Sequence, residues 1–156
     1  MKISETIQYE LERNKPMPSK LHSIIQSNLI GLFFVHYNDI YRVYSELSIS
    51  LEGWDSVPDI AIYNRKEENF REDEIQMSEV PLGVIEILSP TQNMQELIYK
   101  AERYFQQGVL SCWLVFPLLK NIYVFENREY YQIFKHQEEL KDDRLNIRLS
   151  LEKVFH

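Results

Sequence analysis

The chain has 156 residues, of which 44% are hydrophobic and 26% charged, and its formal net charge at pH 7 is −7. This length and balance predict one globular domain, spanning residues 1–156, with a sizeable buried core. The acidic excess argues against a protein that coats nucleic acid through a basic surface. It does not exclude an enzyme that acts on phosphodiesters, because a bound metal ion can supply positive charge locally.

The single cysteine, Cys112, excludes an internal disulfide and a cysteine-based zinc site. Its apolar neighbours at 113–116 predict a buried position on a strand. No apolar run reaches the roughly 18 residues of a membrane span, and the first residues lack the apolar core of a signal peptide. We therefore expect a cytoplasmic protein without membrane association.

The first part of the chain predicts an irregular segment, a helix and a strand. Residues 1–18 are polar and aperiodic. Apolar residues then recur at helical spacing after Ser19, a plausible N-cap, and predict a helix over about 19–37. Apolar and polar residues alternate over 41–51, which predicts a half-buried strand.

Two further strands are predicted on either side of a charged segment. Residues 57–63 form a short apolar run, and 64–80 are dense in charge and predict a solvated excursion. Residues 82–88 form a third strand, which Ser89-Pro90 ends.

The second half of the chain predicts a helix followed by strands. Apolar residues between 94 and 105 recur at helical spacing, and Gly108 is a plausible residue just beyond the helix C-terminus. The remaining predicted elements are a strand at 111–116, a hairpin of 121–126 and 130–135, an alternating stretch at 145–149 and a short amphipathic turn at 151–155.

This order defines the expected fold class, an α/β protein with a mixed (α+β) sheet. The three consecutive strands predict a meander. The helix between residues 88 and 111 supplies the crossover that a parallel neighbouring strand requires. The expected core is thus a helix, a three-stranded meander, a helix and a strand, with an added C-terminal hairpin.

Two predicted strands each contain one acid among apolar residues: Asp59 in Val57–Tyr63 and Glu86 in Val84–Leu88. An ionised carboxylate in a buried strand is costly unless something pairs with it. Glu46 lies on the polar side of the preceding strand, and Lys100 follows on the predicted helix. Three carboxylates on neighbouring strands can form the oxygen-rich pocket that Mg²⁺ prefers, with a lysine beside a bound phosphate.

Each of these residues also has an ordinary structural interpretation. Glu46 alone could be solvated, and Asp59 after a proline could simply shape the strand entry. Lys100 could form an exposed i,i+4 pair with Glu96. Glu86 is the hardest to explain in this way, because the residues on both sides of it are apolar.

Several strings in this order resemble the Uma2-type (DUF820) group of the PD-(D/E)XK nuclease superfamily, which is common in cyanobacteria, over nearly the whole chain. The strings run from the N-terminus to the fourth strand: Tyr9-Glu10-Leu11, Pro16-Met17-Pro18-Ser19 with His22, Val57-Pro58-Asp59-Ile60, Ile85-Glu86-Ile87-Leu88-Ser89-Pro90-Thr91, Glu96 with Lys100 and Tyr104, and Gly108-Val109 with Trp113-Leu114-Val115 and Pro117.

The resemblance implies a restriction endonuclease-like fold in which Asp59 and Glu86 are ligands of Mg²⁺ or Mn²⁺ and Lys100 is the catalytic lysine. Glu46 is expected to join the metal ligands. In the superfamily the lysine usually follows the glutamate by two residues, where this chain has Leu88, so here the lysine is expected on the helix. Three further residues are expected to contact substrate: Glu10, His22 and Tyr104.

The chain also departs from the family pattern. The segment Glu12-Arg13-Asn14-Lys15 is short and lacks the usual glycine turn, which weakens the assignment of Glu10. Glu96 replaces an aspartate, and Cys112 stands where a tyrosine is common.

The expected function is a metal-dependent, endonuclease-like phosphodiesterase that acts on nucleic acid. The alternative is a regulatory module on the same fold that binds nucleic acid or protein without catalysis. A carboxylate-pair glycosidase is disfavoured because it has no place for the lysine. The aromatic hairpin, with Tyr123, Phe125, Tyr130, Tyr131 and Phe134, together with the resemblance, predicts a homodimer.

Overall fold

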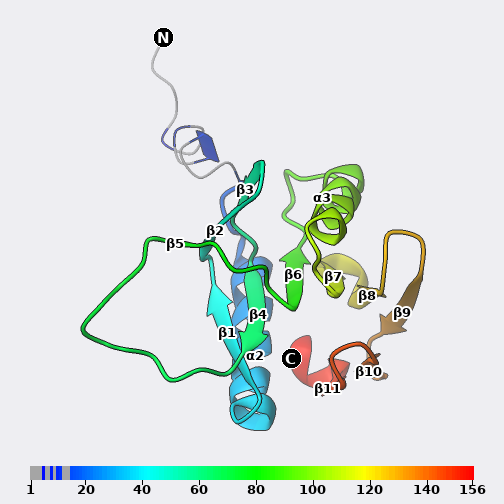
Figure 1. The fold of residues 1–156 in the computed structure, drawn as a ribbon. Coiled ribbons are helices and arrows are strands. Elements are labelled where there is room, and N and C mark those ends of the chain that lie inside the picture. Colours follow the sequence, from blue (N-terminus) through cyan, green and yellow to red (C-terminus); the bar gives the residue numbers. More distant parts are fainter. Residues whose placement is uncertain (1–4, 6–7, 9, 12–14) are drawn as a thin grey trace.

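The computed structural model of the protein describes residues 5, 8, 10, 11 and 15–156. At its centre is a six-stranded mixed sheet with the strand order β1-β4-β6-β7-β8-β9 (Figure 1). The strands of this sheet are β1 (Tyr41–Ser45), β4 (Ile60–Asn64), β6 (Gly83–Ile87), β7 (Ser111–Phe116), β8 (Asn121–Phe125) and β9 (Tyr131–Lys135).

The pairing of these strands confirms the predicted topology. β1, β4 and β6 form an antiparallel meander. β6 then pairs in parallel with β7, and the connection between them contains helix α3 (Met94–Gln106), as a parallel crossover requires. β8 and β9 continue the sheet as an antiparallel hairpin.

The two main helices begin at side-chain caps. Helix α2 (Lys20–Tyr37) follows Ser19, whose Oγ accepts a hydrogen bond from the backbone N–H of His22, as predicted. Helix α3 follows Asn93, whose side chain accepts from the N–H of Glu96. Gly108 lies just past α3 with φ of 98°, a left-handed conformation that glycine adopts without strain.

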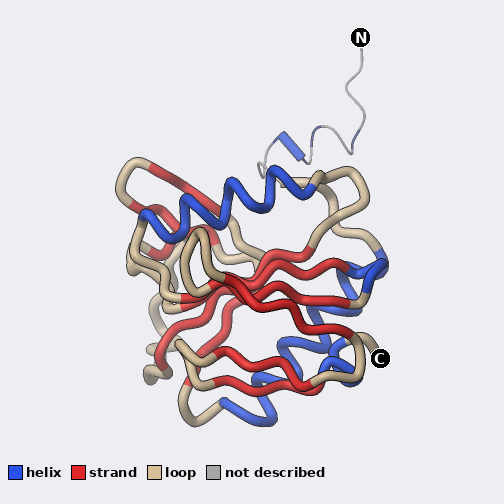
Figure 2. The backbone as a smooth tube through the Cα atoms, turned by 90° about the vertical axis from the view of Figure 1, so that its right-hand side faces the viewer, coloured by secondary structure: helices blue, strands red, loops and turns tan. Residues whose placement is uncertain are grey.

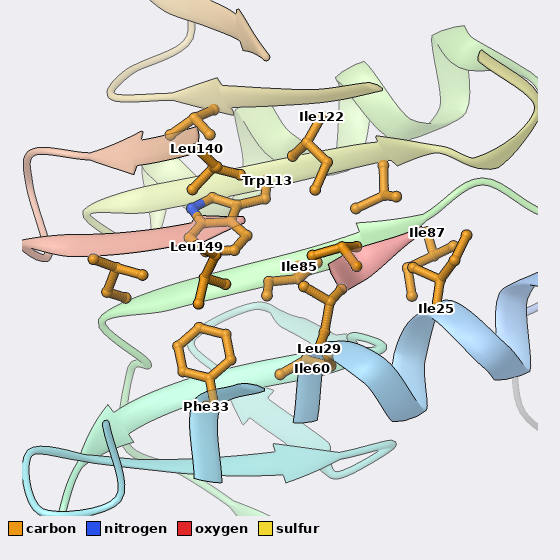
Figure 3. Packing of buried hydrophobic residues seen from close by; sticks show 14 of the residues in the cluster. Ile25, Leu29, Phe33, Ile60, Ile85, Ile87, Trp113, Ile122, Leu140 and Leu149 are labelled. Carbon is orange, nitrogen blue, oxygen red and sulfur yellow. The ribbon is translucent and has the colours of Figure 1, made fainter. Parts of the chain in front are cut away.

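Strand alternation directs the two helices to opposite faces of the sheet. On β6 and β7, Ile85, Ile87, Trp113 and Val115 belong to the core cluster that contains α2, and Figure 3 shows α2 side chains facing those of the sheet. The residues between them pack with α3 in a second cluster, which includes Val84, Cys112, Leu114 and Phe116. Figure 2 shows the strands lying between helical segments. Glu86 therefore points to the α3 side.

The predicted strand over 41–51 is broken in the structure. Glu46 adopts φ of 54°, an uncommon left-handed conformation for a residue other than glycine. The chain therefore leaves β1 and starts a separate strand, β2 (Ser48–Leu51). This strand pairs with β3 (Trp54–Ser56) and with β5 (Gln76–Met77), which lies inside the charged 64–80 excursion. The predicted strand at 57–63 accordingly begins only at Ile60.

A small hairpin and a short helix end the chain. β10 (Glu139–Asp142) was not predicted; it pairs with β11 (Ile147–Ser150), and α4 (Leu151–Val154) follows. A 3₁₀ turn, η1 (Pro117–Leu119), joins β7 to β8. Within the described part of the chain, no helix is long and apolar enough to cross a membrane.

Candidate active site

Asp59, just before strand β4, lies beside Glu86 on the adjacent strand β6. Asp59 immediately precedes β4, and the antiparallel register that pairs Ile60 with Ile85 places it next to Glu86 on β6. Both residues are buried, with 2% relative exposure each. The Oδ2 atom of Asp59 accepts a hydrogen bond of 2.7 Å from the backbone N–H of Ile87, which fixes the carboxylate toward β6.

The other carboxylate oxygen of Asp59 lies beside a lysine and a histidine. Its Oδ1 atom lies 2.6 Å from Lys15 Nζ and 3.1 Å from His22 Nε2. Burial by itself would raise the pKa of Asp59, but the hydrogen bond to His22 and the charge of Lys15 outweigh it and lower that pKa to about 2. Asp59 is therefore ionised at neutral pH.

Glu46 joins this group through Lys15. Lys15 Nζ lies 2.8 Å from Glu46 Oε2, and Glu46 donates its backbone N–H to the carbonyl of Asp59 at 3.2 Å. Gln26 on α2 donates to the same Asp59 carbonyl at 2.9 Å. The left-handed conformation of Glu46 thus brings its carboxylate beside Asp59, although the two residues lie on different segments.

Burial would lower the pKa of Lys15, but the charges of Asp59 and Glu86 outweigh it and raise that pKa above its usual value. Lys15 is therefore a charged ammonium group inside the site.

Glu86 is held from the α3 side. Its Oε1 atom lies 2.9 Å from Lys100 Nζ and accepts a hydrogen bond of 3.0 Å from the Tyr104 hydroxyl. That hydroxyl is also 2.6 Å from Ser56 Oγ. Lys100 therefore pairs with the buried acid, whereas Glu96 accepts a hydrogen bond from Asn93.

Burial and the neighbouring Asp59 raise the pKa of Glu86, and Lys100 opposes this shift only in part. Burial and the charge of Glu86 likewise raise the pKa of Tyr104. The two central carboxylates consequently have pKa values shifted in opposite directions, the pattern often seen where acids serve different roles.

A cavity of about 370 Å³ opens beside these groups, and both Lys15 and Lys100 line it. Trp54 contributes to its wall. The Trp54 ring packs edge-on against the Tyr104 ring, with 4.8 Å between the ring centroids. The Arg103 guanidinium carbon lies 4.9 Å from the centroid of the Trp54 ring. Trp54 thus has a packing role. The cavity offers a ligand access to the two lysines, which in turn contact the three carboxylates.

Six of the seven residues predicted for the site lie in this network. They are Glu46, Asp59, Glu86, Lys100, His22 and Tyr104. Glu10 does not contact them: it accepts a hydrogen bond from the backbone N–H of Met17 and lines a neighbouring surface depression. Its partner in the motif, Tyr9, lies outside the described residues.

The sequence reasoning missed Lys15, Gln26 and Ser56. Of these three residues, only Lys15 could have been anticipated from the sequence, because the predicted acids need a second positive charge nearby. Three acids placed in or beside buried strands need more compensation than Lys100 alone provides. Lys15 occurs in the same segment as the Pro16-Met17-Pro18 string.

The donor set fits a hard divalent cation by its chemistry. Glu46, Asp59 and Glu86 offer carboxylate oxygens, the ligands of Mg²⁺ and Mn²⁺. Among the residues that the structure describes, however, no group of three His, Cys, Asp or Glu side chains is arranged to hold an ion. Lysine ammonium groups contact all three carboxylates instead.

This sheet, with helices on both faces and a carboxylate pair at two neighbouring central strands, defines a restriction endonuclease-like domain. The chain belongs to the Uma2 family, described as "Putative restriction endonuclease", whose model matches residues 2–152. Family membership supports a nuclease-like function.

The structure is similar to the crystal structure of a protein from Anabaena variabilis ATCC 29413 that is described as a putative nuclease belonging to DUF820. The two chains are 24% identical, the match covers 90% of this chain and 83% of that one, and the TM-score is 0.77. This likeness supports the fold. Among curated proteins, none matches the chain.

Proposed function

We propose that the protein is a metal-dependent, endonuclease-like phosphodiesterase that acts on nucleic acid. The observation that carries this proposal is the contact of two adjacent buried acids, Asp59 and Glu86, with lysines that line an open cavity. Buried carboxylates close to a cavity are costly for folding, so their presence here fits a chemical role.

In this proposal Asp59, Glu86 and Glu46 hold Mg²⁺ or Mn²⁺. The ion, when bound, would polarise a phosphodiester and neutralise part of its charge. The Ile87 N–H and His22 orient Asp59. Tyr104, itself in contact with Ser56, orients Glu86. These contacts fix both carboxylates before substrate arrives.

Lys100 is the catalytic lysine of the proposal. Its ammonium group contacts Glu86, and the residue lines the cavity. It can therefore stabilise negative charge that develops on phosphodiester oxygens, or hold the attacking water. In the superfamily pattern the lysine would stand at position 88, where this chain has Leu88. Lys100 on α3 would take over its role, because it contacts Glu86 from the helix.

A cleavage assay tests the proposal. Native protein is incubated with single- and double-stranded DNA and RNA, with Mg²⁺, Mn²⁺ or EDTA. We expect cleavage of at least one substrate that requires the metal and is lost in Asp59→Asn. Exposed Asp143→Asn is the matched control and should cleave like the native protein. Failure of the folded native protein to cleave any substrate would favour a binding module on the same fold.

A further inference from the structure

The Lys15 ammonium group lies between the carboxylates of Glu46 and Asp59. Its Nζ atom is 2.8 Å from Glu46 Oε2 and 2.6 Å from Asp59 Oδ1. The Lys15 side chain is only 8% exposed. These three residues come from separate parts of the chain, so the contact is a feature of the folded site.

We propose that Lys15 is the resident counter-ion of the Glu46–Asp59 pair, and that a divalent cation binds this pair by displacing the Lys15 ammonium group. This inference rests on the proposed function, since it assigns the cation to the same carboxylates. It adds to that function an exchange step: the Lys15 side chain, which comes from the N-terminal segment, must leave the carboxylate pair before the divalent cation binds.

The geometry at Asp59 makes the two cations competitors. Oδ2 is engaged by the Ile87 N–H at 2.7 Å, and Oδ1 is the atom that Lys15 contacts. Mg²⁺ binds carboxylate oxygens at 2.0–2.1 Å. A divalent ion at that distance from Oδ1 and an ammonium group at 2.6 Å would repel each other strongly in a buried site.

The charge of the site points the same way. Among the described residues, Lys15 is an ammonium group that contacts both Glu46 and Asp59. A divalent ion bound to the same pair beside Lys15 would bring two positive charges close together in a buried environment, which is costly. Exchange of Lys15 for the ion removes this repulsion.

A neighbouring depression on the surface can accommodate the displaced ammonium group. Lys15 lines both the main cavity and a neighbouring depression of about 300 Å³, which Glu10 and Glu96 also line. Rotation of the Lys15 side chain toward these carboxylates would keep its charge compensated. Helix α2 need not move, because Lys15 precedes its first residue, Lys20.

Lysine labelling of the full native chain tests the displacement directly. The protein is treated briefly with an acetylating N-hydroxysuccinimide ester, with and without saturating Mn²⁺, and the modified lysines are quantified by mass spectrometry. We expect Mn²⁺ to speed the acetylation of Lys15 at least ~10-fold, a coupling within the usual range for linked sites. Exposed Lys20 serves as the internal control and should be acetylated at the same rate with and without Mn²⁺. An unchanged or slower rate at Lys15 would overturn the inference.

Calorimetric titration with Mn²⁺ separates this inference from the proposed function. Lys15→Met should bind Mn²⁺ at least ~10-fold more tightly than the native protein, and Lys20→Met should match the native protein. Equal or weaker binding by folded Lys15→Met would overturn the displacement while leaving the metal site intact. Absence of binding by native protein and Lys15→Met alike would overturn both. If circular dichroism shows that Lys15→Met does not fold, the labelling of the native chain decides.

Discussion

Lys100 on helix α3 and Glu86 on strand β6 are joined by a contact of 2.9 Å between Nζ and Oε1. The contact ties the helix to the central strand at the level of the cavity. It also settles a question that the sequence left open, because the alternative partner, Glu96, is engaged by Asn93 instead. Lys100 compensates a buried charge, so we expect its mutation to affect both the stability of the fold and the proposed cleavage.

Replacement of Lys100 by methionine should abolish most of the proposed cleavage. We expect a drop of at least ~100-fold, the usual scale for loss of a positioned charge-stabilising or proton-transfer group. Because Glu86 loses its cation, the metal-free protein should also lose about 2 kcal/mol of stability. Lys100→Arg should restore stability better than activity, since its wide planar head does not match a point charge. Rates and urea unfolding curves measure the two effects; native rates in Lys100→Met would remove Lys100 from the mechanism.

Glu86→Gln should change the pH dependence of stability in the metal-free protein. The pKa of Glu86 is raised in the fold, so its ionised form destabilises the native state above the usual pKa of 4.5. As the pH falls through the raised pKa, native Glu86 takes up a proton and this penalty disappears. The stability of Glu86→Gln relative to native should therefore be greatest at pH 8 and decline toward pH 5. A difference that stays constant over this range in urea unfolding would contradict the raised pKa.

Asp142 should be a structural acid, separate from the candidate site. It is buried, and its carboxylate accepts hydrogen bonds from Ser111 Oγ, Trp113 Nε1 and the backbone N–H of Leu145. Asp142→Ala leaves these donors without a partner and should cost about 3 kcal/mol in chemical unfolding. The exposed neighbour gives a matched control: Asp143→Ala should change stability by no more than about 0.5 kcal/mol. Equal effects of the two variants would contradict the assignment.

We assign the contact of the predicted homodimer to one strand, β9. β9 is an edge of the main sheet, and Tyr130, Tyr131 and Ile133 are exposed on or beside it, whereas Phe125 is buried. Such an edge favours pairing with a second copy. Light scattering at micromolar concentration should give a dimer, and Ile133→Lys should give a monomer.

Val35, an exposed apolar residue on α2, provides the control for this test. Val35→Lys should remain dimeric. A monomeric native protein, or a dimer that only Val35→Lys disrupts, would contradict pairing through β9.

The sequence predicts the sheet and its central acids well because their signals are local. Apolar strands such as that of Val84–Leu88 and the helical spacing of α3 are set by residues close together in the chain. An acid among apolar neighbours, such as Glu86, stands out for the same reason.

The parts that sequence reasoning missed depend on distant contacts. Lys15 meets Asp59 across 44 positions and comes from a segment without periodicity. The turn at Glu46 lacks the glycine or asparagine that usually marks a left-handed residue. In β10 the two buried positions are Leu140 and Asp142. Because one of them is an acid, the alternation of apolar and polar residues that predicts a strand is absent.

The central claim is that Asp59 and Glu86 hold a divalent cation, and calorimetric titration with Mn²⁺ on native protein and Glu86→Ala tests it most directly. Glu79→Ala, which removes an exposed acid, is the control. The account predicts saturable binding by the native protein and the control, with binding by Glu86→Ala weakened at least ~10-fold. Equal Mn²⁺ affinity in native protein and folded Glu86→Ala, or no binding by the native protein, would contradict it.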